Sequence, residues 1–145
     1  MSALRSDEVE LPLETGPRVI VPIGRVDAAA LRAITYASAI ASHLTILQLR
    51  RGEAALEVRR QLRQLGVARG AEFVEVAGSG DAVERIAVTI DVVAADDPER
   101  RIAIVIPSIV PRRLWLLPLH LGGLRLKLRL FGRPNTAVVD VPYHV

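Results

Sequence analysis

Two neighbouring arginines are the residues best suited to bind a charged ligand. Arg112 and Arg113 follow Pro111, just ahead of the chain's single tryptophan. Arginine presents a fixed fork of N–H donors that matches a phosphate or a carboxylate. The pair therefore predicts a clamp on a phosphate group or on an acidic partner surface. The alternative is a solvated pair that keeps the adjoining leucine-rich segment soluble.

A glycine pair further along the chain is the second candidate for anion binding. Gly122 and Gly123 precede a segment expected to be helical, and the free N–H groups at a helix N-terminus can hold a phosphate. Glycine pairs also serve as tight junctions between a loop and a helix. The residues themselves support both interpretations.

The segment between these two candidates is strongly apolar. Its centre is Trp115, Leu116 and Leu117, with further leucines on both sides. An exposed apolar patch of this kind usually marks a surface for a partner protein. A segment folded down over the sheet would bury the same side chains, and the sequence supports the two interpretations almost equally. We take these three residues as candidate partner-binding residues.

No set of residues with catalytic spacing can be identified. The histidines, His43, His120 and His144, are far apart, and none has the neighbouring histidine that a metal site would require. The serines lack the G-x-S-x-G context of a nucleophile elbow, and the chain has no cysteine. We therefore expect a protein that is not an enzyme and requires no metal or other cofactor. A hydrolase or transferase is the least favoured alternative.

The pattern of predicted elements indicates one α/β domain, residues 18–145, after an N-terminal arm, residues 1–17. Short β-branched runs predict buried strands, and apolar residues at spacings of three and four predict helices. The expected strands are 18–23, 43–48, 72–76, 101–106 and 136–141, and the expected helices run over about 28–41, 54–65 and 82–95. Their alternation, with short links, predicts an open, five-stranded, mostly parallel sheet with helices on both faces.

One segment fits two structures. Leu124 to Leu130 alternates leucine with basic residues, which by itself favours a half-buried strand. However, a crossover between parallel strands needs about a dozen residues, usually as a helix, and this is the one segment available. We favour a helix with Leu121, Leu124, Leu128 and Phe131 on one face. Arg125 and Arg129 would then lie together on another face.

Composition limits the class of protein further. The 145 residues suit a single domain, and a net charge of +3 is too small to predict a nucleic-acid partner. The longest uncharged run, residues 33–49, contains several polar residues and fits a helix followed by a strand better than a membrane span. The N-terminus is acidic where a signal peptide would be apolar. We therefore expect a cytoplasmic protein without a transmembrane segment.

Three motifs in the last third of the chain carry a family resemblance. They are Val105-Ile-Pro-Ser-Ile-Val-Pro-Arg-Arg113, Leu124-Arg-Leu-Lys-Leu128 and Asp140-Val-Pro-Tyr-His144. As a set they resemble the universal stress protein family, most closely the stress-protein-like cytoplasmic domain at the C-terminus of bacterial amino-acid and potassium permeases. The resemblance covers residues 18–145. It implies a regulatory or sensor domain that binds a transporter, or a small phosphate-bearing ligand.

The same resemblance implies where a ligand would bind. One branch of the family holds ATP at the carboxyl ends of the strands, using an aspartate after the first strand and glycines after the fourth. Here Gly24 stands in place of the aspartate and Pro107 in place of the first glycine, so the site is expected to be degenerate. The implied cleft residues are Ile23, Gly24, Gln48, Pro107, Ser108, Arg112, Arg113, Gly122 and Gly123. A true nucleotide-binding stress protein, holding ATP, AMP or a cyclic dinucleotide, is the alternative.

The last strand carries an expectation of its own. Stress-protein relatives commonly pair through this strand, antiparallel across a two-fold axis. Val139 and Val141 fit an apolar edge of that kind, and an unprotected edge invites pairing. The resemblance therefore implies a homodimer.

Overall fold

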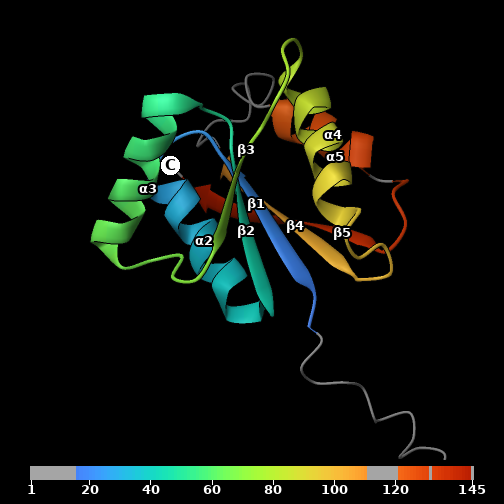
Figure 1. The fold of residues 1–145 in the computed structure, drawn as a ribbon, viewed down its shortest axis with the longest axis horizontal. Coiled ribbons are helices and arrows are strands. Elements are labelled where there is room, and N and C mark those ends of the chain that lie inside the picture. The colour runs from blue at the N-terminus through green and yellow to red at the C-terminus, as the bar shows by residue number, and fades with distance from the viewer. Residues whose placement is uncertain (1–15, 111–120, 131, 145) are drawn as a thin grey trace, which may run out of the picture.

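All five strands run parallel in one open sheet (Figure 1). The computed structural model describes residues 16–110, 121–130 and 132–144. The strands are β1 (Arg18–Ile23), β2 (His43–Gln48), β3 (Glu72–Glu75), β4 (Ile102–Val110) and β5 (Thr136–His144). Their order across the sheet is β3-β2-β1-β4-β5. The predicted fold class is confirmed.

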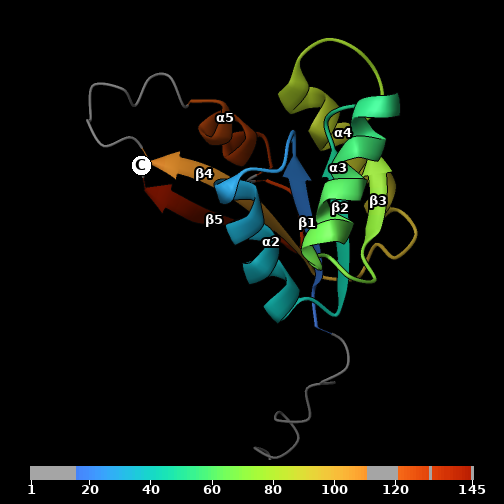
Figure 2. The ribbon, with the colours of Figure 1, turned by 90° about the vertical axis from the view of Figure 1, so that its left-hand side faces the viewer.

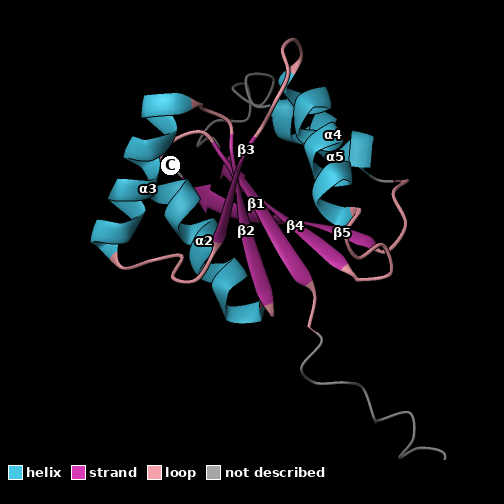
Figure 3. Cartoon of the chain, viewed as in Figure 1, coloured by secondary structure: helices cyan, strands magenta, loops and turns pink. Residues whose placement is uncertain are grey.

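Helices cover both faces of this sheet and bury a separate core on each (Figures 2 and 3). The helices are α2 (Ala28–Ile40), α3 (Gly52–Leu65), α4 (Ala82–Ala94) and α5 (Leu121–Leu130). The core on the α2 and α3 side includes Ile34 and Leu62. The core on the α4 and α5 side includes Ile90 and Leu130. In the ranges that the structure describes, no helix is long and apolar enough to cross a bilayer.

Local signals in the sequence account for the helix ends. Asp27 begins α2 as an N-cap, and its carboxylate accepts a hydrogen bond of 2.8 Å from the N–H of Ala30. Gly66 ends α3 in the left-handed conformation, with φ of +72°. Asp81 precedes α4 without a side-chain cap bond. Its carboxylate instead accepts a hydrogen bond of 2.9 Å from Arg125.

The ambiguous segment is a helix, as favoured, and its described buried leucines are not those of the predicted apolar face. Leu126 and Leu130 are buried, whereas Leu128 is 68% exposed. Arg125 and Arg129 do share a face, and they pair with Asp81 and Glu84 of the neighbouring α4 side at 2.9 and 2.7 Å. Burial of Leu126 and Leu130 orients the helix, because exposed ion pairs such as these contribute little free energy. Leu121, Leu124 and Phe131 have no described side chains.

The ion pairs between α5 and α4 also favour the charged form of one arginine. Glu84 accepts a hydrogen bond from Arg129 and raises the pKa of its guanidinium above the ordinary value. Arg133, just after α5, pairs with Asp91 of α4 at 2.7 Å. On this side of the molecule, Arg125, Arg129 and Arg133 therefore each have a carboxylate partner.

The last two strands are longer than predicted. They pair with each other as far as Val110 and His144, whereas the sequence pattern ended them near residues 106 and 141. By contrast, β1 pairs with β4 only through its first three residues, Arg18 to Ile20. Pro22 and Pro107 lie beyond this pairing, where the missing N–H costs no ladder bond between the two strands. The two central strands thus separate toward their carboxyl ends.

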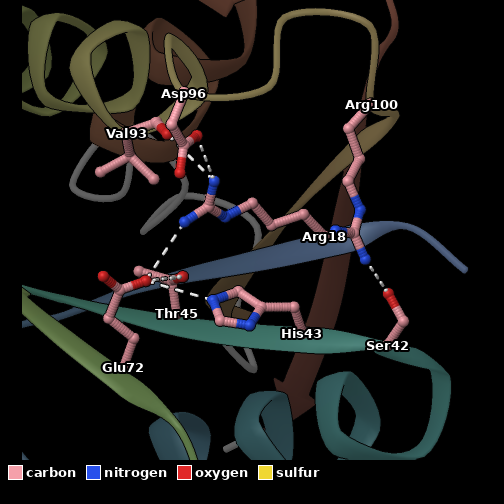
Figure 4. A network of polar contacts seen from close by, with 8 residues as sticks. All are labelled: Arg18, Ser42, His43, Thr45, Glu72, Val93, Asp96 and Arg100. Carbon is pink, nitrogen blue, oxygen red and sulfur yellow. Dashed lines mark hydrogen bonds and ion pairs between the residues drawn. The ribbon is translucent and has the colours of Figure 1, made fainter. Parts of the chain in front are cut away.

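A polar network closes the opposite, amino-terminal end of the sheet (Figure 4). The buried Arg18 donates hydrogen bonds of 3.0 Å to the carbonyl of Val93, 2.9 Å to Asp96 and 3.2 Å to Glu72. His43 lies 3.1 Å from the same oxygen of Glu72. One side chain of β1 therefore ties β3 to the end of α4.

This network predicts a dependence of stability on pH. The hydrogen bond with His43 and the contacts with Arg18 hold the pKa of Glu72 below its ordinary value of 4.5. A depressed pKa adds stability that is present above 4.5 and is lost as the pH falls through the folded-state value. We expect Glu72→Gln to flatten the acid limb of the unfolding free energy measured by urea denaturation.

The matched control for that measurement is Glu99→Gln. Glu99 is exposed and makes no ion pair within the described residues. If the two variants lost the same acid dependence, the network around Arg18 would not hold the carboxylate of Glu72 in its charged form.

Candidate ligand cavity at the strand ends

The separation of β1 and β4 opens a cavity of about 410 Å³ at their carboxyl ends. The chain passes from β1 to β2 on one side and reaches β4 on the other. In open α/β sheets this reversal of strand order is where ligands usually bind. The lining residues come from β1, α2, α4, β4, α5 and the adjoining loops. They are Pro22, Ile23, Gly24, Arg25, Asp27, Ala29, Ala30, Leu49, Ala82, Val83, Ile86, Ile106, Pro107 and Leu126.

The chemistry of this lining is mainly apolar. The charged residues among those that line it are Arg25 and Asp27, whose side chains approach to 3.7 Å. One oxygen of Asp27 is already used by the N-cap bond to Ala30. The volume suits a small molecule. The cavity is thus an apolar chamber with one ion pair, and a ligand with an apolar part suits it better than a fully charged one.

Three of the cleft residues expected from the sequence meet in this cavity. Ile23 and Gly24 line it from the end of β1, and Pro107 lines it from β4. A Cβ built on Gly24 would lie 3.7 Å from Leu49, an ordinary contact, and the backbone there has no left-handed φ. A larger side chain can therefore stand at this position without backbone strain.

Gln48, also predicted for the cleft, does not line the cavity. It is 1% exposed. Its side chain donates a hydrogen bond of 2.9 Å to the carbonyl of Ala55 and accepts one of 3.2 Å from Arg59. Both ends of the amide are thus used to hold α3 on the sheet, which is a structural role.

The remaining predicted cleft residues lie in β4, in α5 or outside the described residues. Ser108 lies within β4, and Gly122 and Gly123 lie in the first turn of α5, the helix that contributes Leu126 to the cavity. Arg112 and Arg113 fall outside the described residues, as do Trp115, Leu116 and Leu117. The arginine clamp and the apolar partner patch therefore stay predictions.

Val139 and Val141 were predicted as partner-binding residues, and the structure places both side chains inward. Val141 is 8% exposed in the core under α2, and Val139 packs partly buried against the same core. The strand β5 is nevertheless the last in the sheet and pairs only with β4 in the described part of the chain. Pairing with another chain at this edge would use its backbone and not these two side chains.

Sequence reasoning missed the contributions of the helices to the cavity. Asp27 lies beside Arg25 at the cavity, and neither residue was predicted as a cleft residue. Leu126 was not among the residues expected on the apolar face of α5. No sequence signal marked Ala82 and Val83 as lining residues, because their position depends on how α4 packs across the sheet.

Metal binding has no candidate site among residues 16–110, 121–130 and 132–144. No group of three or more metal-ligating side chains is close enough together there to hold an ion.

Comparison with known families identifies the kind of domain. A family model described as the KimA potassium transporter C-terminal domain matches residues 15–143. The chain belongs to this family. The match spans all the described strands and helices but one residue of β5, so the KimA C-terminal domain is the parallel α/β unit described above. The transporter part of the predicted resemblance is confirmed, and the assignment to the universal stress protein family stays a prediction.

Solved structures and curated proteins give no further assignment. The solved structure of pantothenate synthetase from Thermus thermophilus matches with a TM-score of 0.46 and 13% identity. The match covers 98% of this chain and 60% of that enzyme. At this level of similarity nothing follows about the KimA-type domain. No curated protein matches the chain.

Proposed function

We propose that this chain is a non-catalytic regulatory domain of a potassium transporter, acting on the cytoplasmic side of the membrane. The match to the KimA C-terminal domain over residues 15–143 is the observation that carries this proposal. Regulation requires a state that responds to a signal. The cavity between β1 and β4 offers a place for that signal, because its walls come from both faces of the sheet.

The ligand best suited to this cavity has a flat apolar part and a polar part. Apolar residues of α2, α4 and α5 would enclose the first, and Arg25 with Asp27 would face the second. A ligand held in this way contacts helices on both faces of the sheet, so its binding changes how firmly they pack. No cofactor is required for this role.

A nucleotide-binding protein of the universal stress protein type is the second candidate. The position of the cavity at the reversal of strand order favours it. ATP, AMP or a cyclic dinucleotide would place its base in the apolar chamber. Two residues argue against ordinary ATP binding, because Gly24 supplies no carboxylate and Pro107 supplies no N–H.

A homodimer through the edge of β5 remains part of this proposal. An exposed strand edge pairs readily with a second copy, and β5 pairs on one side only in the described residues. Sedimentation of the purified chain is expected to give a species of twice 15.8 kDa. A monomer at all concentrations would exclude pairing through this edge.

The regulatory role is tested by transport. The full chain is produced together with a KimA-type transporter in cells that lack other potassium uptake, and rubidium tracer influx is measured. We expect the chain to change the influx severalfold, and Gly24→Leu, which narrows the cavity, to reduce that change. Influx that is the same with and without the folded chain would refute the role.

A further inference from the structure

A second cavity lies at the opposite end of the sheet, between the end of α3 and the start of β3. Its volume is about 470 Å³, and it shares no lining residue with the cavity at the strand ends. Three arginines line it, Arg59, Arg63 and Arg69, and none of the described lining residues is acidic. The other lining residues are Leu62, Gly66, Val67, Ala68, Gly70, Ala71 and Phe73.

The three arginines differ in how they are held. Arg59 is fixed, because it donates a hydrogen bond of 3.2 Å to Gln48 and its guanidinium lies 5.0 Å from the centre of the Phe73 ring. Arg63 and Arg69 make no side-chain hydrogen bond or ion pair within the described residues. Two free guanidinium groups therefore stand beside a third at one cavity.

This arrangement contrasts with the other face of the molecule. There, Arg125, Arg129 and Arg133 each pair with a carboxylate on or next to α4. The chain thus supplies acidic partners where arginines serve only to hold helices together. Like charges without a counterion repel one another, so the cluster beside α3 favours an anion more than a cation.

The backbone of the loop at this cavity also has features that suit an anion. Gly66, Ala68 and Gly70 have φ of +72°, +57° and +73°, and alanine rarely adopts such a value. The N–H groups of Ala68, Arg69 and Gly70 donate to no acceptor in the part of the chain that the structure describes. Curled loops with successive free N–H groups form concave sites for anions.

We propose that this cavity binds a phosphate group, with Arg63 and Arg69 as its principal ligands and Arg59 as a fixed wall. Two free forks of N–H donors suit the several oxygens of a phosphate. A soluble phosphate ester and the headgroup of an anionic lipid both carry this chemistry. A purely structural role is the competing explanation, since cations near the end of α3 also complement its helix dipole.

Calorimetric titration of the full chain with glycerol 3-phosphate separates these explanations. We expect binding by the wild type and at least tenfold weaker binding by Arg63→Gln and by Arg69→Gln. The matched control is Arg60→Gln, because Arg60 is an exposed arginine of the same helix that pairs with Glu57 and does not line the cavity. The control is expected to bind as the wild type does. The three substituted side chains are exposed, so circular dichroism should show an unchanged fold.

A second experiment, with lipid vesicles, identifies the source of the phosphate group. Co-sedimentation with phosphatidylglycerol vesicles, compared with phosphatidylcholine vesicles, is measured for the wild type and the same three variants. Binding to the vesicles alone, lost in Arg63→Gln and Arg69→Gln but kept in Arg60→Gln, would assign the site to a lipid headgroup. The proposal is overturned if neither probe binds the wild type, or if all three variants bind equally.

Discussion

Replacing Leu130 with alanine is expected to lower the free energy of unfolding by about 3 kcal/mol. Leu130 is 1% exposed and lies in the core that α4 and α5 bury against the sheet. Removing its buried carbon atoms loses their transfer free energy and leaves a cavity that the helices fill only in part. Urea denaturation of the wild type and the variant measures the difference.

Leu128→Ala is the matched control, because it makes the same chemical change two residues away. Leu128 is 68% exposed, and we expect its loss to change the free energy by less than about 0.5 kcal/mol. If residues 124–130 formed an alternating strand, positions 128 and 130 would lie on the same face. Equal destabilisation by the two variants would therefore contradict the helix and its orientation.

The sequence of α5 shows how far local patterns predict this fold. Alternation favoured a strand, and only the need for a crossover between parallel strands favoured the helix. The rotation of that helix was beyond local reasoning, because it depends on how Leu126 and Leu130 pack in one core with Ile90 of α4. The strands of the core were easier, since runs such as residues 18–23 are largely apolar and buried throughout.

Part of the candidate site could likewise be predicted from the sequence, and part could not. Ile23, Gly24 and Pro107 could be predicted because strand ends in a parallel sheet meet at one edge. Gln48 also ends a strand, but both polar ends of its side chain are hydrogen-bonded to residues of α3. The unpaired arginines beside the α3–β3 loop gave no signal, because a lack of partners is visible only in three dimensions.

Narrowing the strand-end cavity has the largest expected effect on function. Gly24→Leu is expected to weaken the binding of a ligand in that cavity by roughly tenfold, about 1.4 kcal/mol. The new side chain enters the space beside Leu49, and the backbone at Gly24 has no positive φ that a larger residue would strain. The fold should therefore survive while the cavity becomes smaller.

Gly132→Leu provides the control for this substitution. Nothing lies within 4 Å of a Cβ built at Gly132, and its φ is likewise not positive. The same side chain is thus added at an open position that does not line the cavity. Both variants should unfold at about the wild-type temperature in the absence of ligand.

The most direct test of the account is a thermal-shift titration of these three proteins with ATP, ADP, AMP, cyclic AMP and cyclic dinucleotides. A ligand at about 100 times its dissociation constant stabilises a folded protein by about 2.7 kcal/mol, which is roughly 9 °C for a chain of this length. We predict such a shift with at least one ligand for the wild type and Gly132→Leu, and a clearly smaller shift for Gly24→Leu. A full shift that Gly24→Leu retains would contradict binding between β1 and β4, and no shift with any of these ligands would contradict a nucleotide as the regulatory signal.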